Sequence, residues 1–147
     1  MVGLVRIRYH MPSHFNIRVY GIWIHDEQLL VNEEIIRGRR VIKFPGGGLE
    51  LGEGPLEGLR REWLEELSLD IEVLRHYYTT DFFQQSAFDD SQVISIYYLV
   101  QAKPSGPIQN VMPGERTYWL PVHEVAEGTF TLPIDRVVGA MLASELR

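Results

Sequence analysis

The order of hydrophobic and polar positions along the chain predicts several β-strands. Residues 15–24 are rich in β-branched and aromatic residues. A polar interruption follows at residues 25–28, and a second apolar run then begins. This order predicts a β-hairpin. Further strands are predicted within residues 41–44, 70–82, 91–102 and 116–120. Residues 91–102 are almost continuously apolar, as is typical of a central strand that is covered on both faces.

Two other segments carry apolar residues at helical spacing. The first runs from about Pro55 to Leu67, and the second closes the chain over residues 134–147. The apolar positions of the second segment are Val137, Val138, Met141 and Leu142. A short helix is also predicted from Pro121 to Val125. Because strands and helices mix without strict alternation, we expect an α+β fold or a mixed-sheet sandwich rather than a doubly wound fold.

The length and composition of the chain fit one folded domain. Of its 147 residues, 45% are apolar and 23% are charged, which is enough apolar material for one core and gives no sign of disorder. We therefore expect a single domain over residues 1–147. Residues 1–14 fit two roles, either an additional edge strand or an arm that forms a dimer.

Charge and cysteine content narrow the classes of partner. The formal net charge is −6, from 20 acidic against 14 basic residues, whereas nonspecific nucleic-acid binding needs a basic face. A small phosphorylated molecule remains compatible with this charge if a metal ion or arginines offset the repulsion. The absence of cysteine excludes disulfides, thiol nucleophiles and cysteine-ligated metals. No stretch has membrane-spanning length and no signal peptide is recognisable, so we expect a cytoplasmic protein without a membrane partner.

The predicted helix from Pro55 has clear signals for its start and its buried face. Proline suits a first helical position, Gly54 then takes the cap position, and Glu57 completes a start that is similar to a capping box. The expected core-facing positions are Leu56, Leu59, Trp63 and Leu67.

A stripe of three carboxylates lies beside this apolar face. At about 100° per residue, Glu62, Glu65 and Glu66 fall within one sector, where like charges destabilise a helix by about 0.2–0.5 kcal/mol per pair. Two interpretations are open: a solvated acidic helix face, or a site for a hard divalent cation such as Mg²⁺, Mn²⁺ or Ca²⁺. Gly58 weakens the helix by about 1 kcal/mol relative to alanine, which is explained if the upstream glycine loop packs against it.

The segment from Gly47 to Leu69 resembles the Nudix box, in which a glycine, a glutamate and an Arg-Glu-apolar-x-Glu-Glu-x-Gly-apolar run stand at fixed spacings. The matching positions are Gly47, Glu53, Arg61, Glu62, Trp63, Glu65, Glu66 and Leu69. Ser68 stands where the box has a glycine that ends the helix in a left-handed turn. The bulky Trp63 asks for a larger pocket under the helix, and Ile42 replaces a common tryptophan.

This resemblance implies a Nudix-type α/β/α sandwich and the hydrolysis of a diphosphate linkage in a nucleoside diphosphate joined to a group X. It implies that Glu62, Glu65 and Glu66 bind the metal, Mg²⁺ with Mn²⁺ as an alternative, together with the Gly47 carbonyl. Glu53 completes or supports the site, and Arg61 orients a box glutamate. A homodimer is expected from the same resemblance.

Other candidate residues lie outside the box. Glu62 is the first candidate for the general base, and Asp89, Asp90 and Glu115 are alternatives whose simpler role is loop solubility. Arg37, Arg39 and Arg40 form the densest basic cluster and are candidates for binding a substrate phosphate, or are solvated turn charges. Aromatic residues that could stack on a base, or fill the core, are Tyr77, Tyr78, Phe82, Phe83 and Phe88.

Three further functions are weighed against the hydrolase. A catalytically silent Nudix-fold module that binds a nucleotide or nucleotide sugar is the main alternative, although all box glutamates are retained here. A classical phosphate loop lacks its Gly-Lys-Ser/Thr signature in this chain. An EF-hand calcium protein carries its acids in a twelve-residue loop rather than on a helix.

Overall fold

A computed structural model of the chain describes residues 11–103 and 114–146. The strands are β1 (His14–Ile22), β2 (Ile24–His25), β3 (Gln28–Ile36), β4 (Arg39–Lys43), β5 (Gly46–Gly48), β6 (Ile71–Thr79), β7 (Ser91–Ala102) and β8 (Glu115–Pro121). The helices are α1 (Pro55–Leu67) and α2 (Pro133–Glu145), with short 3₁₀ turns at Val122–Glu124 and Glu127–Thr129. The predicted N-terminal strand or dimer arm lies largely outside the described residues, which begin at Met11.

The strands form two four-stranded sheets. The first has the order β5-β1-β7-β6, with β1 parallel to β7 and the other neighbours antiparallel. In the second, β3 is the middle strand, with β8 along one edge and β2 and β4 in succession along the other. The expected mixed sheet is therefore confirmed, and its one parallel pair joins strands that are far apart in the sequence.

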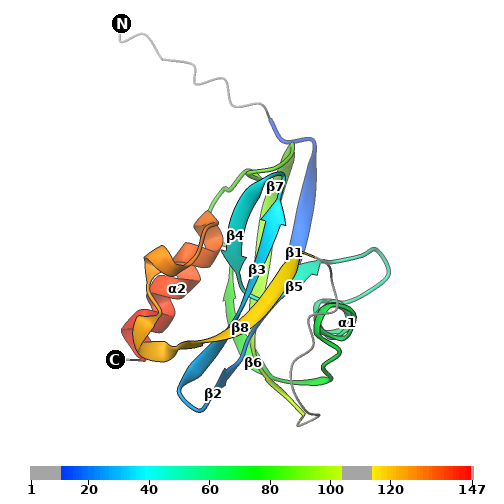
Figure 1. Ribbon diagram of the computed structural model, residues 1–147. Helices are drawn as coiled ribbons and strands as arrows, with labels where there is room; N and C mark the ends of the chain where they lie inside the picture. The colour runs from blue at the N-terminus through cyan, green and yellow to red at the C-terminus, as the bar shows by residue number, and fades with distance from the viewer. Residues whose placement is uncertain (1–10, 104–113, 147) are drawn as a thin grey trace, which may run out of the picture.

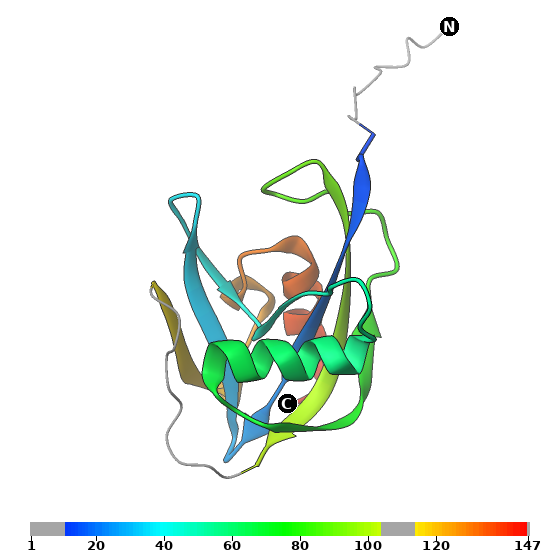
Figure 2. The same cartoon turned by 90° about the vertical axis from the view of Figure 1, so that its right-hand side faces the viewer.

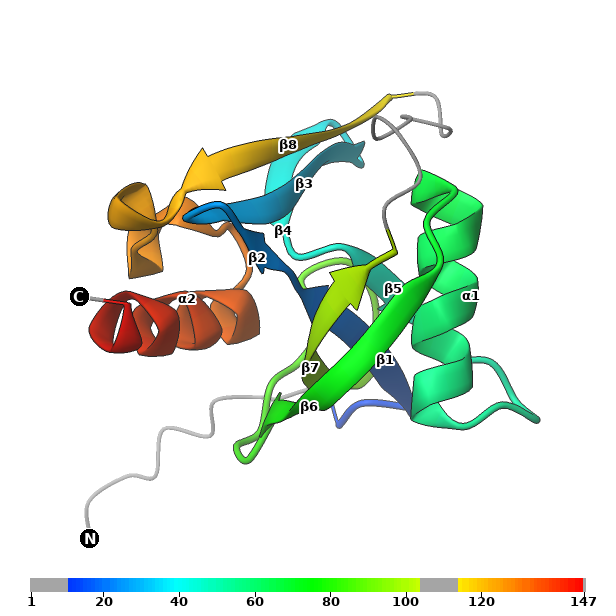
Figure 3. The same cartoon turned by 90° about the horizontal axis from the view of Figure 1, so that it is seen from below.

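The two helices lie on opposite sides of the strands (Figure 1). Helix α1 lies across the face formed by β1, β5 and neighbouring strands (Figure 2), and the view from below shows α2 on the opposite side (Figure 3). This is the α/β/α sandwich that the box motif implied. No helix in residues 11–103 or 114–146 is long and apolar enough to cross a membrane.

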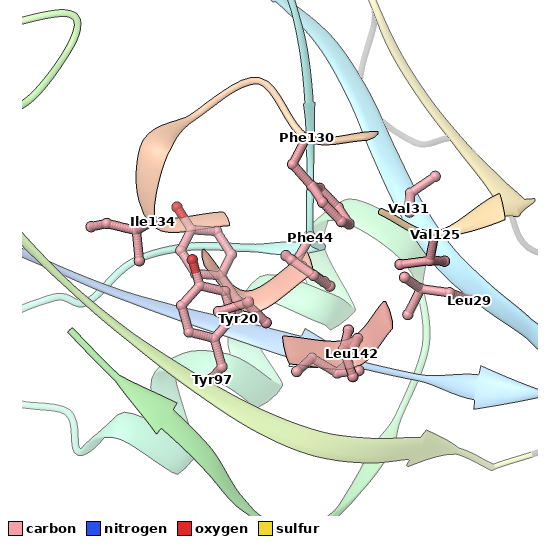
Figure 4. Packing of buried hydrophobic residues seen from close by; sticks show 11 residues of the cluster. Tyr20, Leu29, Val31, Phe44, Tyr97, Val125, Phe130, Ile134 and Leu142 are labelled. Carbon is pink, nitrogen blue, oxygen red and sulfur yellow. The ribbon is translucent and has the colours of Figure 1, made fainter. Parts of the chain in front are cut away.

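Two hydrophobic clusters, one under each helix, hold the layers together. Consecutive strand residues face opposite sides of a sheet, so one strand can contribute to both clusters. Tyr20 of β1 belongs to the cluster under α2, whereas the preceding Val19 packs with Trp63 under α1. In the α2 cluster, Phe44 stacks on Phe130 with ring centroids 4.2 Å apart (Figure 4). The central strands are thus apolar on both faces, which explains their continuous hydrophobic runs.

The predicted hairpin over residues 15–24 is wrong for most of that segment. Strand β1 pairs with β5 and β7 in the first sheet, and the hairpin to β3 is confined to Ile24 and His25 of β2. Hydrophobic alternation fixes which face a residue takes but does not identify the partner strand. The remaining predicted strands and both predicted helices are found close to their expected positions.

Candidate active site

Helix α1 begins and ends where local signals place its ends. Gly54 is its N-cap, and the Gly54 N–H donates to the Glu57 carboxylate at 3.1 Å. The helix ends at Leu67 because Ser68 adopts the left-handed conformation, with φ 54° and ψ 34°. The Ser68 N–H donates to the Leu64 carbonyl at 3.1 Å. Serine therefore takes the turn that the box usually assigns to glycine.

The glycine loop packs directly on α1, as the presence of Gly58 predicted. A Cβ on Gly58 would lie 2.6 Å from Leu49 Cδ1 and 2.9 Å from Glu53 Oε1, so no larger residue fits there without a shift. Likewise, a Cβ on Gly47 would lie 2.5 Å from the Glu62 carboxyl carbon. Leu56 is 38% exposed, contrary to its predicted core position.

Arg61 is the centre of the polar contacts between the loop and the helix. Its Nε and Nη2 donate to the two carboxylate oxygens of Glu53 at 2.9 and 2.6 Å. Nη2 also donates to the Gly48 carbonyl at 3.0 Å. On the helix itself, Nη1 donates to Glu62 at 3.1 Å and to Glu65 at 3.2 Å. One guanidinium thus orients three box glutamates and a loop carbonyl.

The Glu53 carboxylate is held ionised in this arrangement. The two hydrogen bonds from Arg61 and one from the Glu50 N–H lower the pKa of Glu53 to about 2. The same contact with Glu53, opposed by burial, raises the pKa of Arg61 above its usual range. The pair therefore stays charged at physiological pH and ties the loop to the helix.

The opposite side of the carboxylate stripe is crowded with acids. Burial raises the pKa of Glu66 to about 8, with Lys43 opposing and the nearby Glu115 and Glu62 adding to the rise. Burial and a hydrogen bond with Glu34 raise the pKa of Glu115 to about 7. Like charges therefore disfavour the ionised forms of this group, the situation that a bound cation reverses.

The donor set suits a hard divalent cation. The carboxylates of Glu62, Glu65 and Glu66 are the residues that could hold it, and the oxygen chemistry fits Mg²⁺ or Mn²⁺. In the described part of the chain, no three histidine or acidic side chains are already gathered closely enough to hold an ion. Glu65 is exposed and turned towards Arg61. Binding of a cation therefore requires these carboxylates to come closer together.

Glu34 and Lys43, which interact with Glu115 and Glu66, line a cavity of about 250 Å³. Its walls come from β1, β3, β4, β7, the loop of residues 84–89 and the start of α2. The rings of Tyr20, Phe88 and Tyr97 line it together with aliphatic side chains. A pocket with mainly apolar walls and a few polar groups is typical of a small-molecule site.

The cavity contains a buried carboxyl group at the start of α2. Asp135 is 2% exposed, and its Oδ1 accepts a hydrogen bond from the Tyr97 hydroxyl at 2.5 Å. Its Oδ2 has no hydrogen-bond partner among the described residues. Burial raises the pKa of Asp135 to about 6, although the Tyr97 hydrogen bond and the positive charges of Lys43 and Arg18 oppose this.

Two cations in the cavity wall escaped the sequence reasoning. Arg18 donates through Nε to the Tyr20 hydroxyl at 2.6 Å, and Lys43 forms an ion pair with Glu34 at 3.0 Å. Each interrupts an apolar run, Arg18 between Ile17 and Val19 and Lys43 between Ile42 and Phe44. That interruption of the hydrophobic pattern is the signal that could have identified them, because a charge in such a position is kept only when it has a partner or a ligand.

The predicted phosphate-binding arginines lie on the hairpin of β3 and β4. Arg37 is exposed in the turn, and the Arg39 guanidinium lies 5.9 Å from the Phe88 ring centroid. Arg40 forms an ion pair with Glu33 and lines a second, smaller cavity. None of the three lines the main cavity, although Arg39 lies near Phe88, which does.

The alternative bases lie at three different places. Glu115 joins the acidic group around Glu66, as described above. Asp89 lines the cavity, but its carboxylate accepts hydrogen bonds from the Ser91 N–H and hydroxyl, which lower its pKa. Asp90 is exposed and does not line the cavity. The predicted stacking candidates other than Phe88 do not line it either.

Solved structures with this fold are numerous. A NUDIX hydrolase from Nitrosomonas europaea superposes with a TM-score of 0.70 at 21% identity, covering 85% of this chain and 87% of that one. A MutT protein from Methanosarcina mazei Go1 gives a TM-score of 0.73 at 19% identity, covering 95% and 99%. At these identities the likeness establishes the fold.

A comparison of the sequence with known proteins and protein families is more specific than these structural superpositions. A search of curated proteins finds no match. Residues 15–139, most of the chain, match the family profile of the NUDIX domain. This range includes the whole box and every residue that lines the cavity. The chain therefore belongs to the Nudix hydrolase family, as its box motif predicted.

Proposed function

We propose that this protein is a divalent-metal-dependent hydrolase that cleaves the diphosphate linkage of a nucleoside diphosphate derivative. Family membership implies hydrolysis of nucleoside diphosphate-linked substrates. The observation that carries the proposal for this chain is the partly buried group of like-charged acids around Glu66. Lys43 connects this group to a cavity that has Lys43 and Arg18 in its wall. Crowded carboxylates and nearby cations are the two features needed to hold a metal and a phosphorylated ligand together.

In this proposal the box residues act on the diphosphate. Glu62, Glu65 and Glu66, with the Gly47 carbonyl, bind the cation, Mg²⁺ or Mn²⁺, which neutralises phosphate charge and makes a bound water more acidic. Arg61 holds the glutamate rotamers through the contacts described above, and Glu53 fixes Arg61. The two hydrogen bonds between Arg61 and Glu53 support a positioning role for this pair.

The hydrolytic step needs a base for the attacking water. Glu62 is the first candidate, because its carboxylate lies against Gly47 where the loop meets the helix, and Glu115, Asp89 and Asp90 remain alternatives. The water oxygen forms a bond to one phosphorus, its proton passes to the base, and the bridging oxygen leaves with the other phosphate. No covalent intermediate with the chain is required.

The cavity is proposed to hold the part of the substrate beyond the phosphates. Its aromatic and aliphatic walls suit a flat or apolar group, and the unpartnered Oδ2 of Asp135 suits an N–H or O–H donor of that group. Arg37, Arg39 and Arg40 stay predicted contacts for a terminal phosphate. The cytoplasmic location and the homodimer likewise stay predictions.

A substrate panel tests the proposal. The purified protein is incubated with Mg²⁺ or Mn²⁺ and with ADP-ribose, nucleotide sugars, nucleoside triphosphates or oxidatively damaged nucleotides, and phosphate products are measured. We expect hydrolysis of at least one class and complete loss of it when EDTA is added. Metal and nucleotide binding without any turnover would instead favour the catalytically silent binding module.

A further inference from the structure

Lys43 is a buried cation at the junction of the cavity and the box helix. It is the last residue of β4, it is 3% exposed, and it lines the cavity. Its ammonium group forms an ion pair with Glu34 of the neighbouring strand β3 at 3.0 Å. Lysine is rarely buried to this extent without a partner or a role, because removing its charge from water is unfavourable.

The charges around Lys43 come from three elements. Burial lowers the pKa of Lys43, but electrostatic interactions with Tyr20, Glu34 and Glu66 outweigh burial and the repulsion from Arg18, so its pKa is raised. Glu66 belongs to α1 and forms no ion pair with Lys43 within 4.0 Å, so the two interact only through space. Lys43 is therefore shared between a direct partner on the sheet and a more distant one on the box helix.

The position of Lys43 affects how a dication binds at the proposed metal site. A dication beside Glu66 and the ammonium of Lys43 would compete for the same negative charge, and they would repel each other in a partly buried environment. A phosphate group that enters the cavity next to the carboxylates would relieve this repulsion, because it attracts both cations. The buried lysine thus links occupation of the cavity to occupation of the carboxylate group.

From this geometry, and resting on the proposed function, we propose that Lys43 is an internal counter-cation of the carboxylate group. It neutralises Glu34 and Glu66 while the box carboxylates hold no dication, and it is directed to a phosphate oxygen of the substrate once they do. Lys43 then couples the two sites reciprocally: it weakens the binding of the metal alone and strengthens the binding of metal and phosphate together.

Binding measurements on substituted protein test this role without any catalytic turnover. Titration calorimetry measures the affinity for Mn²⁺ alone, and then the affinity for methylenediphosphonate, a pyrophosphate analogue that is not hydrolysed, in the presence of Mn²⁺. We expect Lys43→Met to bind Mn²⁺ about tenfold more tightly and the analogue about tenfold more weakly. Lys43→Arg, which keeps the charge, should stay much closer to the unmodified protein in both measurements.

Lys103 offers a matched control. It is exposed at the end of the first sheet and pairs with Asp70 at the same N–O distance of 3.0 Å. Lys103→Met removes an equal charge from the chain, and we expect neither affinity to change. If this control tightened Mn²⁺ binding as much as Lys43→Met, the effect would be one of net charge and the specific role of Lys43 would be refuted.

The outcomes separate this inference from the proposed function. Unchanged or weaker Mn²⁺ binding in Lys43→Met, with a circular dichroism spectrum like that of the unmodified protein, overturns the role of Lys43 alone. Absence of Mn²⁺ binding in the unmodified protein overturns both the metal-dependent function and this inference. If Lys43→Met does not fold, Lys43→Gln, which still donates a hydrogen bond to Glu34, is measured instead with the same expected directions.

Discussion

The indole ring of Trp63 occupies the space that a side chain on Gly21 would need. A Cβ on Gly21 would lie 2.6 Å from Trp63 Cζ2, and the ring is completely buried. The indole Nε1 donates to the Pro45 carbonyl at 3.2 Å, immediately before the glycine loop. A glycine in β1 therefore provides the larger pocket that a tryptophan in the apolar slot of the box requires.

Gly21→Ala is expected to destabilise the protein by about 1–3 kcal/mol, because the new methyl group would push the indole and with it α1 away from the sheet. Urea unfolding followed by tryptophan fluorescence measures the loss. Gly128→Ala is the control, since no atom lies within 4 Å of its Cβ position. An equal effect of the two substitutions would contradict the packing argument.

Ser68→Gly is expected to stabilise the protein by about 0.5–1 kcal/mol. Ser68 has a φ of 54°, a conformation that is unfavourable for residues with a side chain and easy for glycine. The gain is limited because glycine also increases the entropy of the unfolded chain. Thermal unfolding checks the sign, and Ser68→Val, which is β-branched, should shift the stability in the opposite direction. A destabilising Ser68→Gly would mean that the side chain stabilises the helix end in another way.

Local signals explain which parts of the fold were predictable. The bounds of α1 follow from Gly54, Pro55 and the apolar period, all of which act within a few residues. The metal-binding candidates were identified for the same reason, since a box on one loop and one helix is contiguous in sequence. Strand β7 was recognised because it is apolar on both faces.

Features that depend on distant pairing were missed. Strand β1 pairs with β7, which lies more than 70 residues later, and the hydrophobic pattern of residues 15–24 does not identify that partner. The cavity was missed for the same reason, because Arg18, Lys43 and Asp135 meet only after β1, β4 and α2 have packed together. The arginines at positions 37, 39 and 40 were selected as a local cluster in the sequence, although none of them lines the cavity.

Arg61→Lys is expected to lower hydrolysis about 10- to 100-fold while changing stability little, because lysine keeps the charge but cannot bind both oxygens of Glu53 and also reach Glu62 and Glu65. Steady-state kinetics should show the loss mainly in kcat. The adjacent Arg60 is exposed, so Arg60→Lys serves as the control and should retain full activity. Normal kcat in Arg61→Lys would rule out the positioning role.

Asp135→Asn is expected to change how stability depends on pH. The pKa of Asp135 in the folded protein is about 6, above its value of about 4 in the unfolded chain, so its contribution to stability is present below about pH 4 and is lost as pH rises through about 6. Asparagine does not ionise and can still accept the Tyr97 hydrogen bond. The variant should therefore gain about 2–3 kcal/mol relative to the unmodified protein between pH 4 and pH 7.

Urea unfolding at several pH values in this range tests the Asp135 prediction. The other titrating acids, including Glu66 and Glu115, are present in both proteins and cancel in the difference. A difference in unfolding free energy that stays constant from pH 4 to pH 7 would show that Asp135 is not buried as a largely neutral acid.

Glu65→Gln and Glu66→Gln are each expected to reduce hydrolysis by about 100-fold or more without destabilising the fold. If an acid served only the fold, the protein would lose stability when the charge of that acid was removed. The pKa of Glu66, however, is raised by burial and by neighbouring acids. Its negative charge is therefore unfavourable in the absence of a cation. Glu57→Gln is the control: Glu57 faces away from the stripe and caps the Gly54 N–H, so it should cost about 0.5 kcal/mol of stability and leave the rate near normal. A metal-binding acid loses rate and keeps stability when it is substituted, whereas a structural acid keeps rate and loses stability. Full activity in either Glu65→Gln or Glu66→Gln would remove that residue from the site.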